Sequence, residues 1–315
     1  MDKIEQILST NGIVQFLFLV LVTAFGCAKV TVQGRCCRKY IRNSQDSVLY
    51  NVMFFASVAA ALAIALPLSS VTTSIVVWAA IHSFSYAAFQ ILYSVALTCG
   101  PVSLTVLIIN FSSLISTAFS VIALNEKLFL TQVIGIIFLI TSMILSCNKT
   151  AGEKKATKKW VILTVTCLLT NGVGACIQMM FSRSETVKNI PNSDNTYLVV
   201  LYIFSAIVSL FVYLIVANTG KKEKSTFWFS KNVLFYAMAV GVIIGIFQKG
   251  YMMGNKTIPG TFMFPTYYGL QSLGMSLIGI ILFKDRLSIR QKIGIVFGVC
   301  CIAMMNVKVG ISFSF

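Results

Sequence analysis

The sequence predicts an all-α membrane protein with ten transmembrane helices, arranged as two inverted five-helix repeats. Three observations lead to this prediction: the chain is strongly apolar, its apolar runs are long enough to cross a bilayer, and its two halves share a pattern of polar residues. Of its 315 residues, 57% are apolar and 11% are charged, against about 25% charged residues in an ordinary soluble domain. This composition argues against a water-soluble enzyme, a disordered chain and a disulfide-stapled secreted module.

The apolar runs each have about the 20 residues needed to cross roughly 30 Å of hydrocarbon. They are continuous, unlike the strands of a membrane barrel, in which apolar and polar residues alternate. The first run lacks a basic segment before it and a small-residue cleavage site after it, so we expect a retained span. The expected spans are 12–32, 48–66, 71–97, 101–124, 129–147, 160–181, 197–217, 232–253, 259–283 and 289–307.

Lysine and arginine residues are concentrated in the loops between spans 1 and 2, 5 and 6, 7 and 8, and 9 and 10. The positive-inside rule places these four loops in the cytoplasm and both termini outside. We therefore attribute the net charge of +16 to membrane topology and expect no nucleic-acid partner. The sequence predicts a multi-pass protein of the plasma (inner) membrane.

The two halves of the chain, 1–150 and 151–315, share polar positions in a fixed order. A basic linker at about 148–159 separates them. Each half has five spans, an odd number, so the second half is expected to lie inverted in the membrane. Inverted repeats are typical of transporters that work by alternating access around a site near the bilayer midplane. The aligned pairs are Leu128 and Leu287, Gln132 and Gln291, Gly135 and Gly294, Phe138 and Phe297, and, with a one-residue shift, Phe89-Gln90-x-x-Tyr93 and Phe247-Gln248-x-x-Tyr251.

Two corresponding motifs place an acidic-basic-Leu turn before a glycine: Glu126-Lys127-Leu128 with Gly135, and Asp285-Arg286-Leu287 with Gly294. With the aromatic-rich third span, they resemble the drug/metabolite transporter superfamily, in particular its EamA-like ten-helix members. The resemblance implies a secondary transporter with a central cavity; family members move amino acids, sugars, nucleotide sugars, drugs and vitamins. The chain departs from the family in two ways. Ten-helix members usually keep both termini cytoplasmic, and small multidrug members use a membrane-embedded glutamate, whereas all nine acidic residues here fall in predicted loops or tails.

Polar residues inside spans are costly and often mark a transport pathway. Those of span 3 recur at helical spacing on one face, and spans 4, 6, 8 and 9 add others. The same residue types also join helices as structural contacts, so both roles stay open. The candidates for substrate binding are His82, Tyr86, Gln90, Tyr93, Asn110, Asn171, Gln178, Gln248, Tyr251, Tyr267 and Gln271.

Lys29 and Lys249 are the only cations expected within spans. Each either extends to the membrane interface or contacts a substrate, in which case an anionic or zwitterionic metabolite, such as an amino acid or organic acid, is favoured. His82 is the only histidine, so we expect no His/Cys metal site. Its side chain can titrate near neutrality or can serve packing alone.

We expect a secondary transporter rather than an enzyme, because the spans contain no Ser/His or paired-acid constellation and the chain has no P-loop or Gly-rich cofactor loop. No cofactor is expected, and the expected partners are a small-molecule substrate and the lipid bilayer. Two alternatives stay open. The first is a sugar-phosphate or nucleotide-sugar exchanger of an organelle membrane, and the second is a channel or non-transporting membrane scaffold.

Overall fold

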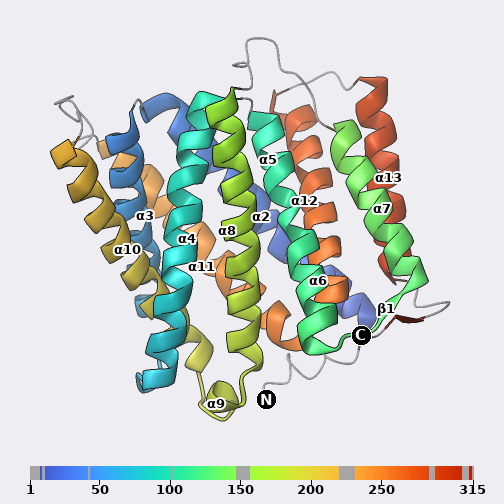
Figure 1. Cartoon of the computed structure of the whole chain (residues 1–315), viewed down its shortest axis with the longest axis horizontal. Helices are drawn as coiled ribbons and strands as arrows, with labels where there is room; N and C mark the ends of the chain where they lie inside the picture. The colour runs from blue at the N-terminus through green and yellow to red at the C-terminus, as the bar shows by residue number, and fades with distance from the viewer. Residues whose placement is uncertain are drawn as a thin grey trace. The chain divides into compact units, whose positions relative to one another are not determined.

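The computed structural model describes residues 8, 11–41, 43–100, 102–146, 157–219, 231–283, 288–306, 312 and 313. The motif Asp285-Arg286-Leu287 and residues 148–156 of the expected linker lie outside these ranges. The described segments are almost entirely helical (Figure 1). The elements are α2 Gly12–Tyr40, α3 Ser44–Ala65, α4 Thr73–Cys99, α5 Val102–Asn110, α6 Ser112–Leu124, β1 Leu128–Phe129, α7 Leu130–Ser146, α8 Lys158–Arg183, α9 Glu185–Lys188, α10 Ser193–Thr219, α11 Lys231–Thr257, α12 Gly260–Phe283, α13 Ile289–Asn306 and β2 Ser312–Phe313.

Within the described ranges, six helices are long and apolar enough to cross a membrane. They lie in α2, α3, α4, α8, α10 and α11, and two shorter apolar helices cover Ile108–Leu124 and Leu130–Leu145. The length and hydropathy of these six helices are those of transmembrane segments, as expected of an all-α membrane protein. The full set of ten spans stays a prediction.

Two of the expected spans differ from the helices observed. Helix α2 continues to Tyr40, well past the expected end at residue 32, because basic residues end an apolar run without ending a helix and are good helix formers. The expected fourth span is divided into α5 and α6 at Phe111, where the backbone hydrogen bonds Phe111 N–Ile108 O and Leu114 N–Phe111 O tighten to i−3 spacing.

Side-chain caps fix where several helices begin. Asn43 accepts a hydrogen bond from the backbone N–H of Asp46 at the start of α3, and Thr157 accepts one from Trp160 N at the start of α8. Each cap satisfies a backbone donor that the first turn of a helix leaves unpaired. Asp46 itself lies in the first turn of α3 and is only 2% exposed. The expectation that every acidic residue lies in a loop or tail is therefore wrong for Asp46.

The chain folds into two compact units, and each takes segments from both halves of the sequence. Unit 1 comprises residues 1–27, 101–153 and 253–315, and unit 2 comprises residues 28–100 and 154–252. These spatial units are a different division from the expected sequence halves 1–150 and 151–315, which stay a prediction.

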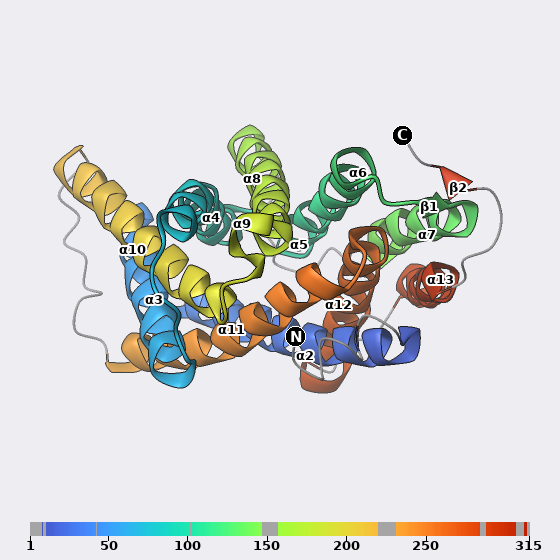
Figure 2. The same cartoon turned by 90° about the horizontal axis from the view of Figure 1, so that it is seen from below.

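Unit 1 contains a close pair of helices, α7 and α13, which lie side by side in Figures 1 and 2. The Phe138 and Phe297 rings meet edge to face between them, with centroids 5.4 Å apart. Helix α12 packs on α6, α7 and α13. Strand β1 pairs antiparallel with β2, placing Leu128 opposite Phe313.

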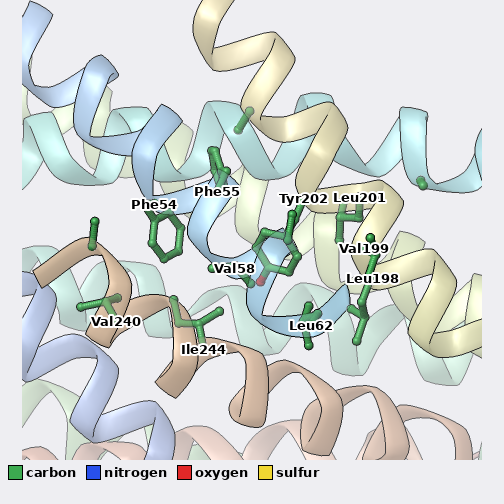
Figure 3. Close-up of a cluster of buried hydrophobic side chains, with 14 of the residues drawn as sticks. Phe54, Phe55, Val58, Leu62, Leu198, Val199, Leu201, Tyr202, Val240 and Ile244 are labelled. Atoms are coloured by element: carbon green, nitrogen blue, oxygen red, sulfur yellow. The ribbon is translucent and has the colours of Figure 1, made fainter. Parts of the chain in front are cut away.

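Unit 2 has the larger apolar core. Its helices α3, α4, α8 and α10 pack against one another, and α11 adds to the buried cluster. Figure 3 shows the centre of this core, where Phe54, Phe55 and Val58 of α3 meet Tyr202 of α10 and Ile244 of α11. Between membrane helices such side chains stabilise the unit through close van der Waals packing, which fixes the helices that carry its polar residues.

Candidate substrate-binding site

The expected polar face of α4 meets α10 inside unit 2. His82 Nδ1 lies 2.6 Å from the Tyr197 hydroxyl, and the Tyr86 hydroxyl lies 3.2 Å from that of Tyr202. Gln90 Nε2 reaches the Tyr86 hydroxyl at 3.5 Å. Residues four apart share one helix face, so the regular spacing of α4 brings His82 and Tyr86 to α10 and places Gln90 beside Tyr86. The structure thus joins three of the predicted site residues.

This row of contacts extends to two further helices. Gln33 of α2 donates from Nε2 to Gln90 Oε1 at 3.2 Å, and Gln248 of α11 forms a side-chain hydrogen bond with Tyr202. A single chain of neutral polar groups, from Gln33 through Gln90, Tyr86 and Tyr202 to Gln248, therefore links four helices of unit 2. Amides and phenols both donate and accept hydrogen bonds, so such a chain can exchange an internal bond for one to a polar substrate.

Aromatic rings surround the α4–α10 contact. Phe181 of α8 stacks on Tyr197 with ring centroids 3.8 Å apart, and Tyr86 meets Tyr202 edge to face at 5.6 Å. His82 fits beside Gly174 of α8, where an added Cβ would lie 3.1 Å from the imidazole Nε2. The arrangement gives the polar groups rigid, apolar walls, which is the usual composition of a small-molecule site.

A positive charge lies on α11 of the same unit. Lys249 is half-buried and donates from Nζ to Asn195 Oδ1 at 2.5 Å. Asn195, in the first turn of α10, in turn donates to the Pro67 carbonyl at 2.8 Å. The lysine is therefore positioned by a side chain that is itself hydrogen-bonded, so its charge has a defined place in unit 2.

The other predicted residues of unit 2 have packing contacts. Tyr93 stacks on Phe89 and Tyr251 packs on Phe247, each pair with ring centroids 5.6 Å apart. Gln178 donates to Met252 Sδ at 3.3 Å. The remaining two, Asn171 and Lys29, are half-buried on α8 and α2.

Three predicted residues belong to unit 1. Asn110 is the last residue of α5, next to the break at Phe111. Tyr267 and Gln271 are buried on α12, where Tyr267 meets Tyr268 edge to face at 4.9 Å and the Gln271 carbonyl accepts the Cys27 thiol at 3.8 Å. Within unit 1, these residues therefore lie in the divided fourth span and on α12, which packs on α6.

Four residues of the network are not among the candidates predicted from the sequence: Gln33, Asn195, Tyr197 and Tyr202. Gln33 and Asn195 lie just outside the expected spans, because polar residues end the apolar runs there. Tyr197 and Tyr202 were inside an expected span, and a search of that span for polar residues at near-helical spacing would have found them. Among the described residues, no group of three or more His, Cys, Asp or Glu side chains could hold a metal ion.

Comparison with protein-family models and with curated proteins found no match. Among solved structures, one named only "Crystal structure of protein" is similar, with a TM-score of 0.65 and 15% sequence identity over 91% of this chain and 95% of that chain. At this level of identity the likeness shows a shared fold and carries no function.

Proposed function

We propose that this chain is a secondary transporter that moves a small anionic or zwitterionic metabolite across a membrane by alternating access. The proposal rests above all on the way helices at corresponding positions of the two expected repeats pack together. Within unit 1, α7 packs on α13 and α6 on α12; within unit 2, α3 packs on α10. These are the fifth, fourth and second spans of each repeat, paired with their counterparts, and this pairing supports the proposed pseudo-two-fold arrangement.

Local contacts at repeat-related positions support the same interpretation. Gln132 Oε1 accepts from the backbone N–H of Phe129 at 3.0 Å, and Gln291 Oε1 accepts from that of Ser288 at 2.8 Å. Both glutamines are three residues beyond the donor, at aligned positions of the two halves. A matching polar contact is harder to obtain by chance than a matching apolar residue, so this pair adds weight to the repeat.

The irregular helices also correspond between the repeats. The fourth span is interrupted at Phe111, and the ninth span, α12, contains Pro265. Helix α12 stays continuous across Pro265, so only the fourth span is divided, and segments broken by Gly or Pro are a pointer to the binding region of a transporter. In unit 1 these segments pack together, and the Ser112 hydroxyl of α6 donates to the Tyr268 hydroxyl of α12 at 3.4 Å.

The packing of repeat-related helices bears on how the protein would move. A motion of one sequence half against the other would separate α7 from α13 and α3 from α10, exposing their buried side chains. The proposal therefore assigns the motion of alternating access to the two compact units, each of which contains helices from both repeats.

The polar groups of unit 2 favour a substrate with both donors and a negative charge. Lys249 offers a fixed positive charge beside Asn195, and the chain of amides and phenols offers neutral donors and acceptors. A substrate could place a carboxylate against Lys249 and an amino or hydroxyl group against the side-chain amides of this chain. Amino acids and organic acids fit this description.

The experiment that tests the proposal is a thermal-unfolding screen of the purified protein, followed by counterflow in proteoliposomes. The screen uses amino acids, organic acids, sugar phosphates, nucleotide sugars and cationic drugs, because a ligand of the folded state raises the melting temperature by mass action. Any stabilising compound is then loaded inside vesicles, and uptake of labelled compound is measured. Faster uptake into preloaded vesicles is expected of a carrier.

Uptake that does not respond to preloading would point to a channel and overturn the proposal. Stabilisation by cationic drugs alone would contradict the assigned substrate class. Gln90→Leu should weaken the response to the ligand. Thr141→Val, on the exposed side of α7, serves as the matched control and should leave the response unchanged.

A further inference from the structure

The end of α2 that follows the first apolar run carries a concentrated positive charge. The segment 28–45 contains no acidic residue, and four basic residues fall close together within it: Arg35, Arg38, Lys39 and Arg42. Helix α2 continues through most of this segment, to Tyr40. Membrane topology accounts for a basic loop, but it does not explain why basic residues lie on a helix that stays packed in unit 2.

This helical extension of α2 has two faces. Gln33 and Cys37, one turn apart, are fully buried, whereas Arg35 and Lys39, also one turn apart, are exposed. The two pairs are offset by two residues, which is roughly 200° around an α-helix. One face therefore packs inside unit 2, and the opposite face presents its positive charges outward. Asp46, the acidic residue nearest to them in sequence, is only 2% exposed.

The exposed basic face lies near the depth of the phospholipid headgroups. The first apolar run is expected to end at residue 32, so Arg35 is about 4.5 Å and Lys39 about 10 Å further along the helix. The headgroup region extends roughly 5–8 Å beyond the hydrocarbon on each side of a bilayer. Arginine and lysine have long apolar stems that let their charged ends adjust in depth, so both charges can reach the lipid phosphates.

Aromatic rings join this end of α2 to the start of α11. The Tyr40 and Tyr236 ring centroids lie 5.8 Å apart, and Lys39 Nζ lies 5.3 Å from the centroid of the Tyr40 ring. A cation within about 6 Å of a ring centroid is attracted to the ring, so the lysine charge has a defined place. Phe235 of α11 is 69% exposed next to Tyr236 and adds an apolar surface beside the charges.

We propose that this surface, formed by Arg35, Lys39, Tyr40, Phe235 and Tyr236, binds an anionic phospholipid. Clusters of four to eight Lys or Arg residues directly cytoplasmic of a transmembrane helix are typical of segments that bind anionic headgroups. The positive-inside rule places this end of α2 in the cytoplasm, and the cytoplasmic leaflet carries the negative surface potential. The inference does not depend on the proposed transport function.

The chemistry of the surface favours an amphiphilic partner over a soluble anion. The two exposed cations attract any anion, but only a lipid also covers the exposed Phe235 ring with an acyl chain. Tyrosine is enriched at the level of the headgroups, where one end of its side chain is apolar and the other is polar. Each basic residue near an anionic membrane strengthens binding roughly fivefold, which is equivalent to about 1 kcal/mol.

The test is thermal unfolding of the full-length purified protein in detergent micelles that contain phosphatidylserine or phosphatidylcholine at equal mole fraction. Phosphatidylserine is expected to raise the melting temperature by about 2–4 °C over phosphatidylcholine when the site is filled. The lipid fraction that gives half of this shift measures the affinity. A third sample contains glycerophosphoserine, the same headgroup without acyl chains, and should show no shift.

Variants connect the lipid response to these residues. The double variant Arg35→Gln with Lys39→Gln should raise the half-saturating fraction of phosphatidylserine about 10- to 30-fold, as expected from the loss of two charges. Lys39→Arg keeps the charge over the Tyr40 ring and should keep the response. The matched control is Lys158→Gln with Lys159→Gln, which removes two exposed charges from the first turn of α8 and should also keep it.

Three results would overturn the proposal. Equal melting temperatures in the two lipids would show that no anionic lipid is preferred. An equal loss of the response in the two double variants would show a general attraction to positive charge and no site on α2. Stabilisation by glycerophosphoserine as large as that by phosphatidylserine would show a site for soluble anions in place of a lipid site.

Discussion

The two units bury their polar side chains in different ways. In unit 2, side chains of different helices bond to one another, as between His82 and Tyr197, or Lys249 and Asn195. In unit 1, several buried hydroxyls bond to the backbone instead: those of Ser116 and Ser120 donate to carbonyls of their own helix, and that of Ser142 donates to the carbonyl of Gly294. Side-chain partners can be exchanged for a ligand, whereas backbone partners hold the fold. This difference is the reason that we propose unit 2 as the unit that recognises the substrate.

The largest expected effect tests this assignment directly. Lys249→Met should weaken binding of the anionic or zwitterionic ligand about 10- to 100-fold, because a hydrogen bond to a charged group contributes roughly 1.5–3 kcal/mol. Isothermal titration calorimetry measures the change. Lys292→Met removes an exposed positive charge from α13 of unit 1 and should leave the affinity unaltered. An equal loss of ligand affinity in the two variants would contradict the difference between the units, since it would show a general effect of positive charge.

Substitutions at the packing contacts of unit 2 should change its stability through the space available to the new side chain. Gly241 and Gly245 lie one turn apart on α11, and an added Cβ at Gly241 would be 2.9 Å from Ser57 Cβ and 3.2 Å from Ser57 C, whereas one at Gly245 would be 3.4 Å from Leu62. Gly241→Ala should cost about 1–3 kcal/mol through overpacking. Gly245→Ala should cost less or gain stability from helix propensity. Melting temperatures in detergent distinguish the pair, and identical values would contradict the close approach of α3 and α11.

Much of unit 2 could be predicted from the sequence, because helical spacing alone places His82, Tyr86 and Gln90 on one face. Their partners could not be predicted in the same way. Tyr197 and Tyr202 are more than a hundred residues further along the chain, and a single sequence contains no information on which helix faces α4. Asn195 and Gln33 fall outside the expected spans but inside α10 and α2, because hydropathy shows where an apolar run ends and not where a helix ends.

In unit 1, too, a contact between distant segments could not be predicted from the sequence. It is made at the turn that follows α6. Glu126 is part of the acidic-basic-Leu motif, and the sequence alone predicts no contact for its side chain. In the structure, its carboxylate accepts the backbone N–H groups of Gly260 and Thr261 at 3.0 and 2.9 Å, and so caps α12. The cap joins segments far apart in sequence, which no local pattern predicts. Asn125, which precedes it, adopts a left-handed conformation with φ of 51° that turns the chain out of α6.

Removing the Glu126 cap is expected to have an effect of intermediate size on the stability of unit 1. Glu126→Ala removes both acceptors from the first turn of α12 and should lower stability by about 1 kcal/mol, within the range for a lost helix cap. Glu126→Gln keeps one carbonyl oxygen and should lose less. The order of the three melting temperatures, wild type above Gln above Ala, is the expected result. An Ala variant as stable as wild type would show that the contact to Gly260 and Thr261 contributes nothing to holding α12.

The smallest expected effect on stability is in the network of unit 2, where Tyr202→Phe removes one hydroxyl. Hydrogen bonds between membrane helices average only about 0.6 kcal/mol, so the melting temperature should fall slightly, by less than in Glu126→Ala. Ligand affinity should nevertheless change, because Tyr202 joins Tyr86 to Gln248. Calorimetry and melting temperatures on the same preparation separate the two quantities. A variant with a large loss of stability and unaltered affinity would reverse the assignment: the network would then be structural, and the recognition proposed for unit 2 would have to depend on Lys249 alone.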